Sequence, residues 1–296
     1  MKKELIIISG PTGVGKTAFV DQILNKTVNS ELINIDMGQF YAPISIGTAK
    51  PDYKATKYKQ HLFDVIKEPI DFDVVKYRKL VIDKINELWG KNILPVLVGG
   101  SAFYIQSLLF PPGETYFTEI DFSDISNEEL WQKLNKVDPE RANQININDR
   151  YRLERALTIW ETTKKRPSEF VPQIDLFADK IEIFILTRER EELYKRIDER
   201  VMEMINSGWI EEVKNLSSEW RQFLNKKKLI GYDDIINYLE NNLDKNALIS
   251  TIQKKTRNYA KRQMTFYRKM EKDISKFNSV QKDQNSIILN WIQITK

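Results

Sequence analysis

A phosphate-binding loop is the strongest chemical signal in this sequence. It fits the spacing of a glycine, four residues and then Gly-Lys-Thr, and its members are Gly10, Pro11, Thr12, Gly13, Val14, Gly15, Lys16 and Thr17. Glycines in such a loop let successive backbone N–H groups point at phosphate oxygens, and the following helix N-terminus adds partial positive charge. Lys16 supplies a cation and Thr17 a hydroxyl for Mg²⁺. The loop predicts a phosphate or diphosphate ligand but not the reaction.

Asp36 is the second candidate for chemistry. It ends an apolar run over residues 31–36 that predicts a strand. Open α/β sheets place functional groups at the carboxyl ends of their strands, beside a loop of this kind. Asp36 is therefore a candidate functional carboxylate that could hold Mg²⁺ through a water, and a helix-capping role is the alternative.

Strands alternate with helices around these residues, which predicts an α/β fold with a P-loop-type parallel sheet flanked by helices. The expected helices follow the loop through Asn25 and cover residues 73–90. The expected strands cover residues 5–9, 31–36, 93–98 and 181–186, and a mainly helical C-terminal third follows the last of them.

The region between the last two predicted strands has a different pattern. Helical spacing occurs around residues 126–136 and 149–165, without a strand of comparable strength. We therefore predict a helical insertion at 113–179. Residues 1–112 and 180–296 would then form the P-loop α/β catalytic core with its helical C-terminal part.

Composition limits the classes of protein that remain. Hydrophobic residues make up 41% and charged residues 30% of the chain, a balance typical of a folded globular protein. No run approaches the ~20 apolar residues that a membrane span needs, so we expect a cytoplasmic protein that does not enter a membrane. Without cysteine, thiol nucleophiles and cysteine-bound zinc are excluded, and we expect the single histidine, His61, to be structural. The net charge of +4 and the basic run at residues 254–269 suit a polyanionic partner.

Nine short motifs occur in an order that resembles the tRNA dimethylallyltransferase (isopentenyltransferase) family, and they span nearly the whole chain. They are GPTGVGKT, SELINIDMGQFY, IGTAKP, HLFDV, VGGSAFYIQSLL, VDPERANQININDRYRLERAL, GWIEEV, LIGYDD and TRNYAKRQMTFYR.

The resemblance implies a prenyl transfer rather than a phosphoryl transfer. The loop at residues 10–17 would hold the diphosphate of dimethylallyl diphosphate, with Lys16 and with Mg²⁺ bound at Thr17. Asp36 would accept a proton from the N6 amine of the adenosine 3′-adjacent to the anticodon. Ser101, where the family usually has threonine, would add a hydroxyl, and Arg190 would contact the diphosphate.

The resemblance also implies that the helical insertion at 113–179 binds tRNA, and it indicates which residues contact the tRNA. The anticodon stem-loop would contact three segments of a monomeric enzyme, which are Asp36, Met37, Gly38 and Gln39; Tyr151, Arg152, Leu153, Glu154 and Arg155; and Lys228, Leu229, Ile230, Gly231, Tyr232 and Asp233. Met37 and Gly38 depart from the family, which commonly has serine at the first of these two places. The region 112–138 is also shorter than in typical bacterial members, so both features bear on the grip of tRNA.

Three other interpretations remain open. An adenylate dimethylallyltransferase would share the loop and the base but would take a free nucleotide. A small-molecule P-loop kinase would need an acid at the end of a hydrophobic strand to hold its metal, and the strand ending at Val98 is followed by Gly99-Gly100-Ser101. A third possibility is an RNA-binding protein that has lost its activity, against which the intact Lys16, Thr17 and Asp36 count.

Overall fold

The computed structural model describes residues 2–110, 120–169, 177–241, 244–280 and 286–295. It divides into two compact units, one made of Met1–Leu109 and Asp175–Lys296 and the other of Phe110–Ile174. The insertion boundary predicted at residue 113 lies outside the described residues, so the domain limits inferred from the sequence stay a prediction.

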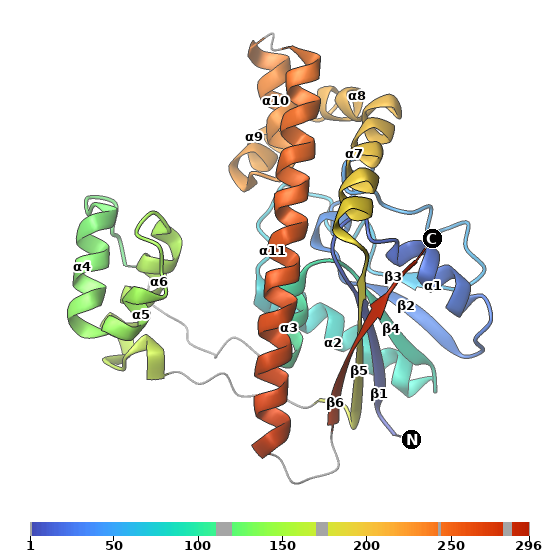
Figure 1. Ribbon diagram of the computed structural model, residues 1–296, viewed down its shortest axis with the longest axis horizontal. Helices are drawn as coiled ribbons and strands as arrows, with labels where there is room; N and C mark the ends of the chain where they lie inside the picture. The colour runs from blue at the N-terminus through green and yellow to red at the C-terminus, as the bar shows by residue number, and fades with distance from the viewer. Residues whose placement is uncertain (1, 111–119, 170–176, 242–243, 281–285, 296) are drawn as a thin grey trace. The chain divides into compact units, whose positions relative to one another are not determined.

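The larger unit is built on a six-stranded sheet in which all pairings are parallel, in the order β3-β2-β4-β1-β5-β6 (Figure 1). The strands are β1 (Glu4–Ser9), β2 (Ser30–Asn34), β3 (Gln60–His61), β4 (Leu94–Val98), β5 (Lys180–Thr187) and β6 (Ser286–Gln293). Central β1 and β4 are short apolar runs, as expected for strands covered on both faces. The predicted P-loop-type α/β fold is confirmed.

The register of the sheet brings three chain segments together at one edge. Val98 of β4 is the partner of Ile8 in β1 and also of Asn34 in β2. The residues that follow these positions therefore leave the sheet side by side, because parallel strands end at the same edge. This register places the phosphate-binding loop, Asp36 and Gly99-Gly100-Ser101 next to one another.

Helices supply the rest of the unit (Figure 1). Those near the sheet are α1 (Lys16–Leu24), the 3₁₀ helix η1 (Met37–Phe40), α2 (Val74–Gly90) and α3 (Ala102–Leu109). The C-terminal ones are α7 (Arg190–Asn206), α8 (Trp209–Lys214), α9 (Ser218–Lys227), α10 (Tyr232–Asn241) and α11 (Lys245–Val280). At 36 residues, α11 is long enough to run past the whole sheet, since an α-helix rises about 1.5 Å per residue.

Three features of the strands differ from the sequence analysis. The two-residue strand β3, which pairs with β2, was not predicted. The C-terminal third, predicted to be mainly helical, ends in β6, which pairs with β5 from Ser286 to Gln293. Its segment SIILNWIQ mixes apolar and amide side chains, as an edge strand does, and gave a weak signal. The strand predicted through Asp36 ends at Asn34, because the Asn34 side chain accepts the Asp36 N–H at 3.0 Å and turns the chain out of the sheet.

The smaller unit is helical, with α4 (Asn127–Val137), α5 (Pro139–Asn143), α6 (Arg150–Thr163) and η2 (Pro167–Glu169). A capping box between Ser126 and Glu129 starts α4 by satisfying backbone N–H groups at its first turn. Apolar side chains at helical spacing meet in its own core, among them Leu130, Leu134, Leu153 and Leu157.

Across the described parts of the chain, no helix combines the length and the apolar character needed to cross a membrane.

Candidate active site

The phosphate-binding loop connects β1 to α1 in a conformation that only its glycines tolerate well. Gly13 and Gly15 have φ values of 79° and 105°, in the left-handed region that side chains disfavour. Lys16 begins α1, and its Nζ donates to the carbonyl oxygens of Gly10 at 2.9 Å and Pro11 at 3.1 Å. Burial lowers the pKa of Lys16 to about 8, with a contribution from Arg200, while Asp36 acts in the opposite direction. The lysine is thus a buried cation that an anionic ligand would stabilise.

Asp36 lies two residues beyond β2 and caps η1. Its Oδ1 accepts the Gly38 N–H at 3.2 Å. The buried Asn34 fixes the approach to it, because Asn34 Oδ1 accepts the Asp36 N–H and Nδ2 donates to the Leu62 carbonyl at 3.0 Å. One carboxylate oxygen of Asp36 is therefore engaged by the backbone, in a side chain that lines the cavity described below.

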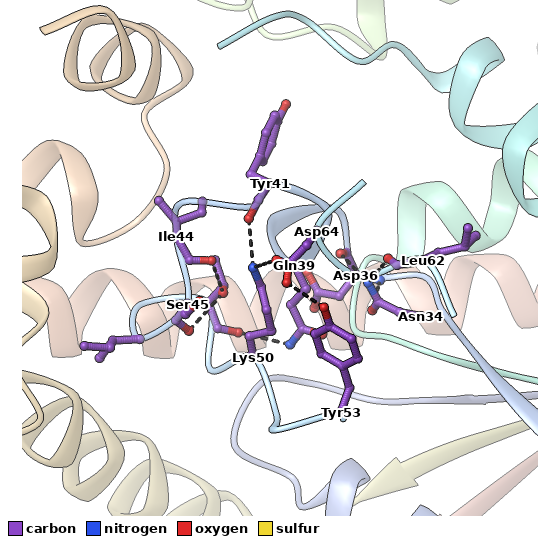
Figure 2. A network of polar contacts seen from close by, with 12 residues as sticks. Asn34, Asp36, Gln39, Tyr41, Ile44, Ser45, Lys50, Tyr53, Leu62 and Asp64 are labelled. Carbon is purple, nitrogen blue, oxygen red and sulfur yellow. Dashed lines mark hydrogen bonds and ion pairs between the residues drawn. The ribbon is translucent and has the colours of Figure 1, made fainter. Parts of the chain in front are cut away.

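A polar network holds the chain around this turn (Figure 2). The Lys50 ammonium binds the Asp64 carboxylate and donates to the Tyr41 carbonyl at 2.8 Å, and the Tyr53 hydroxyl donates to Asp64 at 2.8 Å. Gln39 Nε2 donates to the Thr48 carbonyl at 3.1 Å. Buried polar groups that are satisfied in this way fix one backbone arrangement.

The end of β4 packs directly against the start of the Asp36 turn. A Cβ atom built on Gly99 would lie 2.7 Å from the Ile35 carbonyl carbon and 2.8 Å from the Asp36 nitrogen, so a side chain cannot be accommodated without a backbone shift. Ser101 follows at the start of α3 and lines the cavity. Burial raises the pKa of Tyr259, with a further contribution from Asp36, and a hydrogen bond with Ser101 opposes the shift.

Helix α11 joins the phosphate-binding loop to the segment after β4. Gln263 Oε1 accepts the Thr12 N–H at 3.0 Å, while its Nε2 donates to the Gly100 carbonyl. The Tyr267 hydroxyl lies 2.7 Å from Ser9 Oγ and 3.0 Å from the Gly100 carbonyl. These buried side chains hold the two glycine-rich segments at a fixed separation.

Two arginines bind the phosphate-binding loop, one from within α7 and one from a position two residues before that helix begins. Arg188 Nε donates to the Val14 carbonyl at 2.8 Å, and Arg196 Nε donates to the Gly13 carbonyl at 3.0 Å. Burial lowers the pKa of Arg200, which Asp36 counteracts. The structure places the predicted diphosphate ligand Arg190 elsewhere, exposed and with its guanidinium 5.2 Å from the centre of the Tyr194 ring. Its part in diphosphate binding stays a prediction. Arg196 binds the loop directly, and Arg200 lies close enough to Asp36 for the two charges to interact.

A cavity of about 780 Å³ connects these groups, and its whole lining belongs to the larger unit. The predicted residues Lys16, Thr17, Asp36 and Ser101 all lie in its wall. Its volume is within the range of small-molecule sites. Its wall combines cations with apolar and aromatic side chains, among them Met37, Phe72, Tyr104, Phe223 and Leu229.

Of the predicted tRNA segments, two reach this cavity. Residues 36–39 and 228–230 line it, whereas Gly231, Tyr232 and Asp233 are buried at the start of α10. Their part in tRNA contact stays a prediction.

The third predicted segment lies on α6 of the smaller unit. Tyr151 is 76% exposed, while Leu153 is fully buried in that unit's core. Arg152 and Glu154 form ion pairs with Asp149 and Arg150, and Arg155 is exposed. Leu153 is therefore out of reach of a tRNA at the surface and serves the packing of α6. The other four present polar or aromatic groups to solvent, and their part in tRNA contact stays a prediction.

Several functional residues were missed although the sequence carried a signal for them. Arg196 and Arg200 are four residues apart, as are Tyr259, Gln263 and Tyr267, so each set occupies one face of its helix. The basic run at 254–269 is partly neutralised inside the protein, since Lys255 pairs with Asp233 and Asp234, and Arg257 with Asp198. Arg262 lines the cavity instead, near the ring of Tyr259.

The structure offers few side chains that could bind a metal ion. Among the residues that the structure describes, no three His, Cys, Asp or Glu side chains gather as a metal site would require. The Thr17 hydroxyl and the Asp36 carboxylate are among the side-chain oxygens that line the cavity beside the phosphate-binding loop. His61 lies in β3, with Nε2 2.6 Å from a carboxylate oxygen of Glu31.

Comparison with known proteins gives consistent results. A family model described as IPP transferase matches residues 39–270. A tRNA dimethylallyltransferase of Alkaliphilus oremlandii is 37% identical over 283 residues, covering 92% of this chain and 90% of that protein. One of Rickettsia felis is 35% identical and covers 98% of both chains. A crystal structure of a tRNA isopentenylpyrophosphate transferase from Bacillus halodurans aligns with all of this chain and 92% of its own, with 28% identity and a TM-score of 0.66.

Proposed function

This chain belongs to the IPP transferase family, and we propose that it is a tRNA dimethylallyltransferase that acts on the adenosine 3′-adjacent to the anticodon. The proposed reaction transfers the dimethylallyl group of dimethylallyl diphosphate to the N6 amine and releases diphosphate. The observation that carries this proposal is a single cavity that has a phosphate-binding loop with Lys16 and a carboxylate, Asp36, in its wall.

The phosphate-binding loop would hold the diphosphate. Its backbone N–H groups and the α1 N-terminus suit an anion, and Lys16, Arg196 and Arg200 add charge. In the proposed step, the bond between the allylic carbon and the diphosphate oxygen breaks, and the electron pair leaves with diphosphate. Cations placed where that negative charge develops lower the barrier.

Asp36 would serve the acceptor. The N6 amine of adenosine is a weak nucleophile, because its lone pair is delocalised into the ring. As nitrogen forms its bond to the allylic carbon, the amine proton would move to the Asp36 carboxylate. Positioning and a general base together supply the acceleration that such an attack needs.

The donors beside the loop fit Mg²⁺. This ion is usually bound through one or two protein oxygens, with substrate phosphates and water completing an octahedral shell. Thr17 supplies such an oxygen at the start of α1, next to where the diphosphate would lie. When bound, Mg²⁺ would neutralise charge on the departing diphosphate.

Transfer RNA is the acceptor favoured by the family names, over a free adenine nucleotide or the substrate of a kinase. The smaller unit supports this choice, since Tyr151 and Arg152 on α6 offer a stacking ring and a phosphate contact. Because tRNA is used in the cytoplasm, the proposal places the enzyme there. It further assumes that one copy of the chain is sufficient for the reaction.

The test is incubation of the purified protein with dimethylallyl diphosphate, Mg²⁺ and either unmodified tRNA or AMP, followed by mass spectrometry of the digested nucleosides. We expect prenylated adenosine in tRNA alone. Product from AMP alone would move the assignment to an adenylate dimethylallyltransferase. Consumption of ATP without either product would indicate a kinase, and no reaction at all would indicate a binding protein.

A further inference from the structure

Helix α8 lies between two segments that both lead into the cavity. Trp209 at its start contacts Gly47 on one side and Gly231 on the other. A Cβ atom would lie 2.1 Å from the indole Nε1 if built on Gly47, and 2.0 Å from Cη2 if built on Gly231. The fully buried indole therefore occupies a slot that exists only because both neighbours lack side chains.

Glu212, three residues later on α8, accepts hydrogen bonds from both of these segments through its carboxylate. Oε2 accepts the N–H groups of Ser45 and Ile46, each at 2.8 Å. Oε1 accepts the Tyr232 hydroxyl at 2.7 Å. Hydrogen bonds to an ionised acceptor are stronger than those between neutral groups. This carboxylate therefore links α8 firmly to the 45–49 segment and to α10.

The 45–49 segment in turn supports the turn that carries Asp36. Gln39 Nε2 donates to the carbonyl oxygens of Thr48 at 3.1 Å and Ala49 at 3.4 Å. A Cβ atom on Gly38 would lie 3.2 Å from the Thr48 methyl group, so the Gly38 backbone packs closely against the Thr48 side chain. Gly38 is also the residue whose N–H binds the Asp36 carboxylate.

We propose that Glu212 is a positioning residue for prenyl transfer, which holds the acceptor side of the site through the 45–49 segment. This inference rests on the proposed function. Glu212 is not part of the cavity lining described above, so it acts through Ser45, Ile46 and Gln39 rather than on a substrate. The phosphate-binding loop is held instead by α7 and α11, through Arg196 and Gln263. Loss of Glu212 should therefore disturb the acceptor side and leave diphosphate binding intact.

The experiment compares Glu212→Ala with Glu212→Gln and with Glu211→Ala, a control on the same helix whose side chain is 64% exposed. Three kinds of measurement are made: steady-state kinetics, which give kcat and KM for tRNA; the affinity for inorganic pyrophosphate with Mg²⁺; and hydrogen exchange of the 36–49 peptide. For Glu212→Ala we expect kcat to fall about tenfold or more, since small misplacements of reacting groups cost up to about a hundredfold. Exchange at residues 45–47 should rise, and pyrophosphate affinity should stay within about twofold, since the contacts of the phosphate-binding loop are unchanged.

Glu212→Gln should restore most of the activity, because its amide oxygen still accepts the Ser45 and Ile46 N–H groups and its NH₂ can donate to Tyr232. The inference is overturned if Glu212→Ala matches Glu211→Ala in kcat, or if it loses pyrophosphate affinity in the same proportion as kcat, which would indicate general unfolding. If Glu212→Ala does not fold, a Glu212→Gln variant with unchanged exchange but a tenfold lower kcat would equally overturn it. A wild-type protein that prenylates no acceptor would refute the proposed function itself, and this inference with it, before any variant is compared.

Discussion

Asp36 owes its position to backbone contacts rather than to a partner cation. Its Oδ1 accepts the Gly38 N–H, and its own N–H is bound by the buried Asn34. The carboxylate is thereby presented to the cavity at the carboxyl edge of the sheet, close enough to Lys16 and Arg200 to influence the pKa of each. In the proposed reaction, one residue would thus face both the cations that bind the leaving group and the acceptor.

Substitution of Asp36 by alanine should remove the base without removing the tRNA surface. We expect the single-turnover rate of prenylation to fall roughly 10²-fold or more, as is usual for loss of a general base. The affinity for tRNA, measured by filter binding, should be largely kept. Asp52→Ala, at an exposed carboxylate in the segment between η1 and β3, is the control. Unchanged activity in the Asp36 variant would refute the assigned mechanism.

Lys16 should report diphosphate binding through its proton. In the free protein its pKa is about 8, chiefly because of burial. A bound diphosphate favours the ammonium and raises that pKa, so above pH 8 binding takes up a proton and weakens as the pH rises. Below pH 8 the lysine is already charged and contributes no uptake.

Calorimetry of inorganic pyrophosphate binding in two buffers of different ionisation heat, at about pH 7 and about pH 9, measures this uptake on either side of the free-protein value. Lys16→Ala subtracts the titration of the ligand itself. Equal uptake by the wild type and this variant at the higher pH would show that Lys16 does not carry the proton.

At the scale of elements, the site depends on how closely β4 and β2 end together. Val98 pairs with Asn34, and the next residue, Gly99, touches the backbone of Ile35 and Asp36. Helix α11 adds a second constraint through Gln263 and Tyr267, which tie Gly100 to the phosphate-binding loop. The base and the diphosphate cradle are therefore spaced by the backbone of two strands and one helix.

Gly99→Ala should disturb this spacing, because its Cβ would meet backbone atoms at 2.7–2.8 Å. We expect the free energy of unfolding to fall by about 1–3 kcal/mol, as for an overpacked core, and kcat to fall with it. Gly90→Ala at the end of α2 is the matched control, since nothing lies within 4 Å of its Cβ. That variant should be neutral or more stable by up to about 1 kcal/mol. Urea denaturation and steady-state kinetics measure both, and equal behaviour of the two variants would contradict the role of the close approach.

At the scale of the whole molecule, the chain combines a catalytic unit with a small helical unit that has its own core. The smaller unit exposes Tyr151 beside Arg152 on α6, while the same helix buries Leu153 and Leu157. A helix that buries one face and presents an aromatic ring on the other can lose that ring without losing its fold.

Tyr151→Ala should therefore weaken tRNA binding while leaving thermal stability unchanged. Stacking of a base on an aromatic ring is worth about 1–3 kcal/mol, so we expect an affinity loss of about tenfold. Tyr151→Phe keeps the ring and should bind tRNA like the wild type. A binding assay in which the alanine variant retains full affinity, or in which the phenylalanine variant loses it, would exclude stacking at this position.

The local sequence was sufficient to identify the fold class and to locate the phosphate-binding loop and the carboxylate beside it, whose role as base stays a prediction. A glycine-rich loop between an apolar strand and a helix has few other uses, and Asp36 follows a strand beside it, so both signals lie within short windows. The ordered motifs then identified the family, which the comparisons confirm.

Only the tertiary structure decided which distant residues complete the site. Arg196, Arg200 and Gln263 lie more than 170 residues from the loop, and nothing near them in the sequence indicates what they face. Pairing of β6 with β5 likewise depends on a neighbouring strand rather than on its own composition. Local propensity fixes short-range geometry, whereas the partners of a side chain depend on which strands and helices pack together. This is why the loop and the base were predicted, and why the arginines and the role of α8 were not.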